Sequence, residues 1–284
     1  MLVLAGTVPY KTGLYIGQAR IEGGYLNIEN VNFPIERGTA AMAASAVEVC
    51  KFYGLESPLC IFGGDIADGK GTDLMFQELN SCIDKYDPQI ITLHYMFPKI
   101  SYGKIFLEKI NTLARKPQLI ADAGGMYLAK TIDKAYLFDV FTPDEGELYF
   151  LADEYAPHPL YVRTELQKKD LSVAALIDIA YKNRNTAKTT VVKGKVDYIY
   201  RGGAKLGEVS APDITAMEAV GGTGDTITGM LSALKYKGDM SAESKALNLN
   251  RVIGERITCR PSTQISEFIR AMPRILEEYE KKIQ

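Results

Sequence analysis

The chain has 284 residues, of which 46% are hydrophobic and 24% charged, and its formal net charge is −2. These values are ordinary for a globular protein that is long enough to bury a sizeable core. The near-neutral charge argues against a nucleic-acid partner, and no apolar run approaches the ~18 residues that cross a membrane.

The start of the chain reads as a first strand over residues 1–6, because it lacks the basic flank of a signal peptide. We therefore expect a cytoplasmic protein without a membrane partner. Four cysteines without CxxC spacing and two distant histidines give no reason to expect a disulfide framework or a zinc site.

Residues 15–29 alternate in hydropathy on both sides of Gly23-Gly24, a pair typical of a hairpin turn. We expect residues 10–35 to form a small β lid inserted after the first strand. A plain edge hairpin is the alternative, and the sequence does not separate the two.

The rest of the chain alternates short apolar runs with helical patterns. Strands are predicted over residues 59–62, 90–93, 118–121, 140–141 and 189–192, with a strand pair over 197–200 and 207–210. Helices are predicted over residues 38–53, 102–114, 171–181, 244–257 and 266–279, and others near Leu74, Met126, Glu147 and Ile227. This alternation predicts an α/β fold: one domain over 1–284, with a mostly parallel sheet covered on both faces. Residues 152–167 interrupt it, as a mobile active-site loop or a surface connection.

Polar residues follow the predicted strands at the point where each strand ends. They are Asp65, His94, Asp122, Thr142-Pro143 and Lys193-Gly194. In open α/β sheets ligands bind outside the carboxyl ends of the strands, so these residues are expected at one functional edge.

The glycine-rich loop Gly221-Gly222-Thr223-Gly224 precedes Asp225 and a helical apolar pattern. Glycines allow backbone N–H groups to converge, and a helix N-terminus adds partial positive charge, so the loop predicts an anion site. A carboxylate beside a bound phosphate is well placed to act as a base. A tight connection followed by an Asp cap is the alternative for this loop alone.

Several motifs together resemble the ribokinase-like superfamily of sugar kinases, vitamin kinases and NAD(P)H-hydrate dehydratases. Residues 222–229 are similar to its GxGDxxxG signature, residues 64–71 to its GDxxG segment, and residues 142–147 to its T-P-N-x-x-E element with Asp in place of Asn. Val191-Val-Lys193-Gly194 and the proline segment 260–267 follow in the family's order. The resemblance implies a three-layer α/β/α sandwich with a small β-hairpin lid.

The resemblance also implies roles for individual residues. Asp225 would be the catalytic base that takes a proton from a substrate hydroxyl as it attacks the γ-phosphorus of ATP. Gly222, Thr223 and Gly224 would form the anion hole, with Lys193 and Gly194 near the nucleotide. Asp144 and Glu147 would act on Mg²⁺ through water; a helix-start role is the alternative for Glu147. Substrate-binding residues are expected at Gly38, Thr39, Asp65, His94 and Asp122.

Three functions are compatible with these motifs. The first is an ATP- and Mg²⁺-dependent kinase acting on a hydroxyl of a small metabolite, although the sugar-binding Asp and Asn of the sugar kinases have no counterpart in residues 6–9 and 37–41. The second is an ADP- or ATP-dependent NAD(P)H-hydrate dehydratase, because residues 143–147 and 119–124 resemble motifs of that branch. The Gly-Pro-Gly turn expected of a dehydratase is absent, and residues 94–98 stand in its place. The third is a nucleotide-binding regulatory protein without turnover. Family members often dimerise through the lid, and residues 14–28 can do so here.

Overall fold

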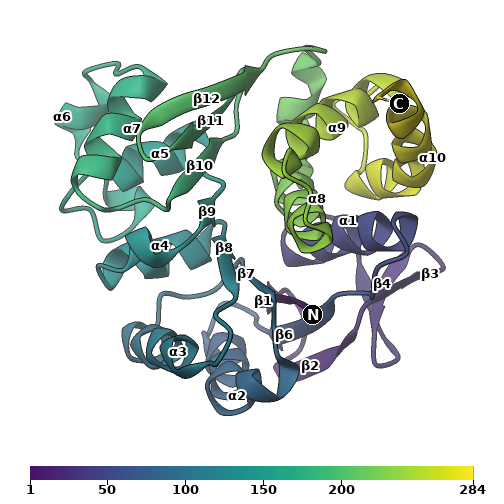
Figure 1. Ribbon diagram of the computed structural model, residues 1–284, viewed down its shortest axis with the longest axis horizontal. Helices are drawn as coiled ribbons and strands as arrows, with labels where there is room; N and C mark the ends of the chain where they lie inside the picture. Colours follow the sequence, from purple (N-terminus) through teal and green to yellow (C-terminus); the bar gives the residue numbers. More distant parts are fainter. Residues whose placement is uncertain (284) are drawn as a thin grey trace.

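The computed structural model describes residues 1–283. Nine strands form the main sheet in the order β12-β11-β10-β9-β8-β7-β1-β6-β2 (Figure 1). The six from β10 to β6 are parallel, which confirms the mostly parallel sheet. At the edges, β2 pairs antiparallel with β6, β11 with β10, and β12 with β11. The strands are β1 (Leu2–Val8), β2 (Gly13–Gln18), β6 (Leu59–Gly64), β7 (Ile90–Leu93), β8 (Gln118–Ala121), β9 (Val140–Phe141), β10 (Thr189–Val192), β11 (Asp197–Arg201) and β12 (Ala204–Val209).

Helices cover both faces of this sheet. The first face carries α1 (Thr39–Phe52), α8 (Thr223–Lys237), α9 (Ala242–Arg256) and α10 (Ile265–Ile283). The second carries α2 (Lys70–Tyr86), α3 (Ile100–Thr112), α4 (Gly124–Thr131) and α5 (Glu145–Ala152), and α7 (Val173–Lys182) packs on α5. Short helices span Ala135–Leu137, Pro159–Tyr161, Thr164–Gln167 (α6) and Thr215–Ala219.

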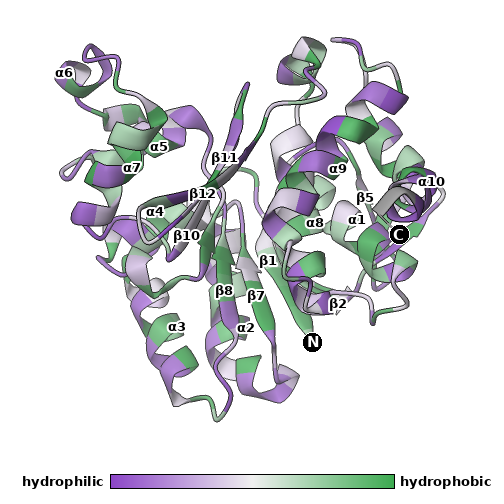
Figure 2. Cartoon of the chain, turned by 45° about the horizontal axis from the view of Figure 1, so that its top comes forward, coloured by the Kyte–Doolittle hydropathy of each residue, from purple (hydrophilic) through white to green (hydrophobic). Residues whose placement is uncertain are grey.

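Alternate residues of β1 serve the two faces, as the period of two in a strand requires. Leu2 and Leu4 pack with the first set of helices, whereas Val3 and Ala5 pack with the second. Because both faces are buried, the central strands are continuous apolar runs, and Figure 2 shows β1, β7 and β8 as largely hydrophobic.

Close packing of α1 on α8 brings the start of α1 to the glycine-rich loop. A Cβ atom on Gly229 would lie 2.0 Å from the Met42 carbonyl oxygen and 2.1 Å from Ser45 Oγ, so only glycine allows this approach. The alanine-rich face of α1 is buried along the contact. As a result, the N-termini of the two helices meet at the same edge of the sheet.

The segment expected to be a β lid divides into two parts. β2 pairs with β6 at the edge of the main sheet, so the boundary of the predicted lid is wrong there. The remainder forms a separate antiparallel sheet of β3 (Arg20–Glu22), β4 (Tyr25–Ile28) and β5 (Val31–Pro34), with the predicted turn at Gly23-Gly24. This small sheet packs beside α1, which buries Leu26, Ile28 and Phe33.

Residues 152–167 form a connection held to the second face of the sheet. The Lys130 ammonium donates to the carbonyl oxygens of Phe150, Asp153 and Ala156, and Arg163 pairs with the buried Asp153 carboxylate. These contacts favour the surface connection over a mobile active-site loop. Within residues 1–283, no helix is both long and apolar enough to cross a bilayer.

Candidate active site

A cavity of about 660 Å³ lies where the carboxyl ends of the strands meet the N-terminus of α8. Its volume is in the range of small-molecule and cofactor sites. The lining combines the predicted polar edge with the glycine-rich loop: Asp122, Asp144, Glu147, Lys193, Gly194, Gly222, Thr223, Gly224 and Asp225. Of the residues predicted for the functional edge, Asp122, Lys193 and Gly194 line this cavity, whereas Asp65, His94, Thr142 and Pro143 are not among its lining residues in the described chain.

The glycine-rich loop passes into α8, which begins at Thr223, and Gly222 is the N-cap of this helix with φ of 102°. A Cβ atom there would also lie 2.9 Å from the Ile265 side chain, so both the backbone angle and the packing require glycine. The backbone N–H groups of the first helical turn have no partner within the helix and carry the positive end of its dipole. Thr223 and Gly224 therefore offer amide donors to an anion in the cavity.

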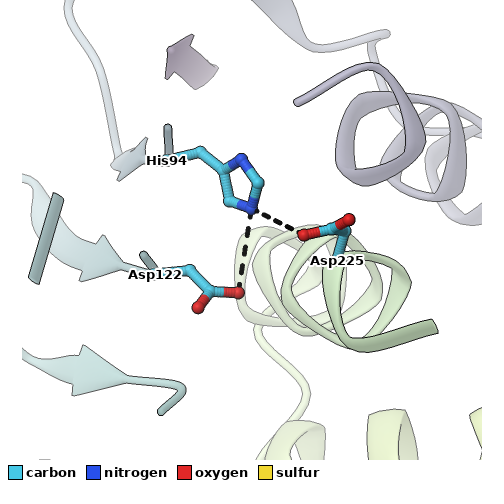
Figure 3. A group of neighbouring side chains, drawn as sticks. All are labelled: His94, Asp122 and Asp225. Atoms are coloured by element: carbon cyan, nitrogen blue, oxygen red, sulfur yellow. Dashed lines mark ion pairs between the residues drawn. The ribbon is translucent and has the colours of Figure 1, made fainter. Parts of the chain in front are cut away.

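Asp225 lies in the first turn of α8 and is held from two sides. The Gly38 N–H donates to Asp225 Oδ2 at 2.6 Å, and His94 Nε2 lies 3.1 Å from Asp225 Oδ1 (Figure 3). Burial by itself would raise the pKa of Asp225, but the His94 ring, the Lys193 ammonium and the Gly38 N–H together lower the pKa below its usual value. The carboxylate is consequently ionised at neutral pH.

Asp122 follows β8 and is fully occupied by neighbouring donors. Lys193 Nζ lies 3.0 and 2.9 Å from the two Asp122 oxygens, the Ala123 N–H donates to Oδ1, and the Thr228 hydroxyl donates to Oδ2. Burial opposes the charge on Lys193, but the carboxylates of Asp122 and Glu147 outweigh it and raise the pKa of Lys193. Lys193 thus neutralises a buried acid beside the site.

His94, Asp122 and Asp225 each offer one atom within 4.8 Å of the others, a grouping that can hold a metal ion. Figure 3 shows the same ring nitrogen of His94 facing both carboxylates. The Lys193 ammonium already occupies both oxygens of Asp122, and a second cation at that carboxylate would be repelled. The donor set therefore does not fit a metal centre.

Asp144 and Glu147 stand at the start of α5 as a reciprocal cap. The Glu147 N–H donates to Asp144 Oδ1, and the Asp144 N–H donates to Glu147 Oε2. Glu147 Oε1 accepts from the Tyr127 hydroxyl at 2.6 Å. Burial and the nearby Asp122 charge raise the pKa of Glu147 to about 7. The exposed Asp144 carboxylate at the cavity wall fits a hydrated Mg²⁺ held through water.

The five expected substrate-binding residues take different positions. The Gly38 N–H donates to Asp225, and His94 Nε2 lies close to both the Asp225 and the Asp122 carboxylates. Thr39 is buried behind His94, with its hydroxyl 3.1 Å from His94 Nδ1. Asp65 accepts the N–H groups of Ala67, Asp68, Gly69 and Thr72, and it is not among the cavity-lining residues of the described chain. Its role in substrate binding stays a prediction.

Two contributors were not predicted from the sequence. Thr228 stands three residues after Asp225, a spacing that places both on one side of α8, so helical periodicity was the available signal. Arg251 of α9 pairs with Asp197 at 2.7 Å and donates to the carbonyl oxygens of Gly194 and Lys195. It fixes the turn after β10, and no local motif marks it.

The family model for NAD(P)H-hydrate dehydratase matches residues 98–267. An uncharacterised protein of Methanocaldococcus jannaschii is 38% identical over 239 residues, covering 83% of this chain and 98% of that protein.

Solved structures of similar fold include a ribokinase-like superfamily protein from Enterococcus faecalis, with a TM-score of 0.58 at 15% identity over 98% of this chain and 87% of that chain. Ribokinase from Cryptococcus neoformans in complex with ADP has a TM-score of 0.55 at 14% identity over 98% and 99% of the two chains. Hydroxyethylthiazole kinase from Pyrococcus horikoshii has a TM-score of 0.53 at 16% identity over 98% and 87%. These likenesses establish the ribokinase-like fold. The family match over more than half of the chain shows that it belongs to the NAD(P)H-hydrate dehydratase family.

Proposed function

We propose that the protein is an ATP-dependent kinase that transfers the γ-phosphoryl group to a hydroxyl of a small metabolite. The observation that carries the proposal is the position of Asp225: an ionised carboxylate, fixed by the Gly38 N–H, next to the amide donors at the start of α8. Phosphoryl transfer needs positioning and electrostatic stabilisation more than covalent chemistry from the protein. This arrangement supplies both.

Each group has a defined part in this reaction. The N–H groups of Thr223 and Gly224 bind and stabilise the charge of the transferred phosphoryl group. Asp225 accepts the proton of the attacking hydroxyl. Asp144, with Glu147 behind it, would hold Mg²⁺ through water, and the ion would neutralise phosphate charge. Because the pKa of Glu147 is raised to about 7, this pair becomes a better cation site as the pH rises through that value.

The second candidate is the nucleotide-dependent dehydration of hydrated NAD(P)H, which the family match favours. The matched residues 98–267 include the glycine-rich loop and Asp225, whereas Gly38 and His94, which we assign to the acceptor side, precede residue 98. The match therefore does not cover the residues that we assign to the acceptor. Residues 94–98, in place of the Gly-Pro-Gly turn expected of a dehydratase, favour the kinase.

One experiment separates the candidates. The purified protein is incubated with Mg²⁺ and ATP or ADP, once with a panel of hydroxylated metabolites and once with hydrated NADH. A kinase yields a phosphorylated acceptor by mass spectrometry. A dehydratase restores the absorbance of NADH without a stable phosphorylated acceptor. Nucleotide binding without either product would refute both and leave a regulatory binding protein.

A further inference from the structure

His94 is fully buried, and its hydrogen bonds determine which ring nitrogen carries a proton. The Thr39 hydroxyl lies 2.7 Å from the Thr7 carbonyl oxygen, which can only accept, so the single hydroxyl proton is donated there. His94 Nδ1 lies 3.1 Å from the same hydroxyl oxygen. Because that oxygen has no second proton to give, Nδ1 must be the donor in this contact.

The second ring nitrogen, Nε2, faces carboxylates only. It lies 3.1 Å from Asp225 Oδ1 and 3.8 Å from Asp122 Oδ2, without a well-aligned hydrogen bond among the described residues. With Nδ1 already protonated, a bare Nε2 would direct its lone pair at carboxylate oxygens. Such a buried, repulsive contact is costly, whereas a proton on Nε2 makes the contact an attractive charge-assisted one.

Charge balance around the ring leads to the same assignment. The groups facing His94 are the Asp122 and Asp225 carboxylates, the Thr39 hydroxyl and the ring of Tyr95, whose centroid is 4.5 Å away. Lys193 balances one carboxylate from the far side of Asp122. Burial and the two carboxylates raise the pKa of Tyr95 to about 12, so this phenol stays neutral. A proton on His94 balances the remaining carboxylate.

We propose that His94 is a positioning residue that carries protons on both ring nitrogens and holds Asp225 Oδ1 through Nε2. With Oδ2 bound to the Gly38 N–H, the Asp225 carboxylate is then clamped on both oxygens, and its remaining lone pairs are directed toward an acceptor hydroxyl in the cavity. His94 thus acts through Asp225 instead of binding substrate. The functional consequence rests on the proposed role of Asp225, but the protonation state does not.

Gly6 leaves the space in which this arrangement fits. A Cβ atom on Gly6 would lie 2.9 Å from the Thr39 side chain and 3.3 Å from His94 Cβ. The close approach of β1 to the start of α1 thus fixes the Thr39 hydroxyl and, through it, the ring of His94.

The protonation state is measured directly by nitrogen NMR of the histidine rings. The chain has two histidines, so the variant His158→Asn leaves the His94 signals alone in the spectrum and serves as the assignment control. At pH 7.5 we expect directly bonded protons on both nitrogens of His94. A ring with a bare Nε2 overturns the proposal, and so does a ring that binds added Zn²⁺ at Nε2. Neither outcome depends on turnover, so failure here is distinct from failure of the kinase proposal.

The effect on catalysis is tested by comparing His94→Gln with His94→Phe. The Gln amide can donate to Asp225 but does not titrate, whereas Phe cannot donate. We expect Phe to lower kcat by about 10- to 100-fold, the equivalent of a lost charged hydrogen bond, with nucleotide affinity unchanged. Gln is expected to recover much of kcat, because its amide N–H can still donate to Asp225 Oδ1. Equal losses of kcat in the two variants would overturn the positioning role.

Discussion

Replacement of Asp225 by Asn tests the central chemical claim. The amide has the same shape, and its oxygen can still accept the Gly38 N–H that now lies 2.6 Å from Oδ2. What is lost is the ability to accept a proton from the acceptor. Loss of a positioned general base lowers rates by about 10²- to 10⁴-fold, which corresponds to about 2.7 to 5.4 kcal/mol of transition-state stabilisation.

The assay compares the initial rate of nucleotide cleavage, with acceptor present, in the wild type and in Asp225→Asn. Calorimetry with ADP measures whether the amide donors at the start of α8 still bind, and we expect affinity within a few-fold of wild type. Asp178→Asn on the exposed side of α7 is the matched control, with the same loss of charge away from the cavity. If Asp225→Asn cleaves nucleotide within threefold of the wild-type rate, Asp225 is not the base.

The other predictions concern the supports of the site. Lys193→Met removes the ammonium group that contacts both oxygens of the buried Asp122 carboxylate, and we expect a loss of about 3–5 kcal/mol in the free energy of unfolding, measured in urea. A loss below about 1 kcal/mol would contradict the assigned pairing. The Glu147 carboxyl has a pKa of about 7, so the folded wild type binds this proton more tightly than the unfolded chain and loses stability as the pH rises from about 4.5 to 7. Glu147→Gln removes the titrating group and should therefore gain stability relative to wild type across this pH range. Melting temperatures of the two proteins that change in parallel with pH would refute the shift. Gly229→Ala should lower the free energy of unfolding by about 1–3 kcal/mol or more, because the added methyl group meets the backbone of α1. Gly207→Ala is the control, since a methyl group there meets no other atom. Equal melting temperatures for the two variants would contradict this packing.

Local patterns in the sequence were sufficient for most of the architecture. The apolar runs of the central strands are buried on both faces, and their alternation with helical patterns indicated a covered parallel sheet. The glycine-rich loop was recognised from its three glycines and from Asp225 directly after Gly224, and the structure gives Gly222 a positive φ. The boundary of the predicted lid failed because residues 13–18 alternate equally well on a free hairpin and beside β6; only pairing with β6 separates these cases.

What the sequence determined by itself was which residues end strands and begin helices, because those signals depend on neighbours in the chain. The contacts that define the site join residues far apart: Gly38 meets Asp225 across 187 positions, and Lys193 meets Asp122 across 71. No periodicity specifies such pairs, since they depend on how closely α1 approaches α8 and on the order of the strands. The tertiary structure alone turned His94, which reads as one of several polar strand ends, into the partner of Asp225.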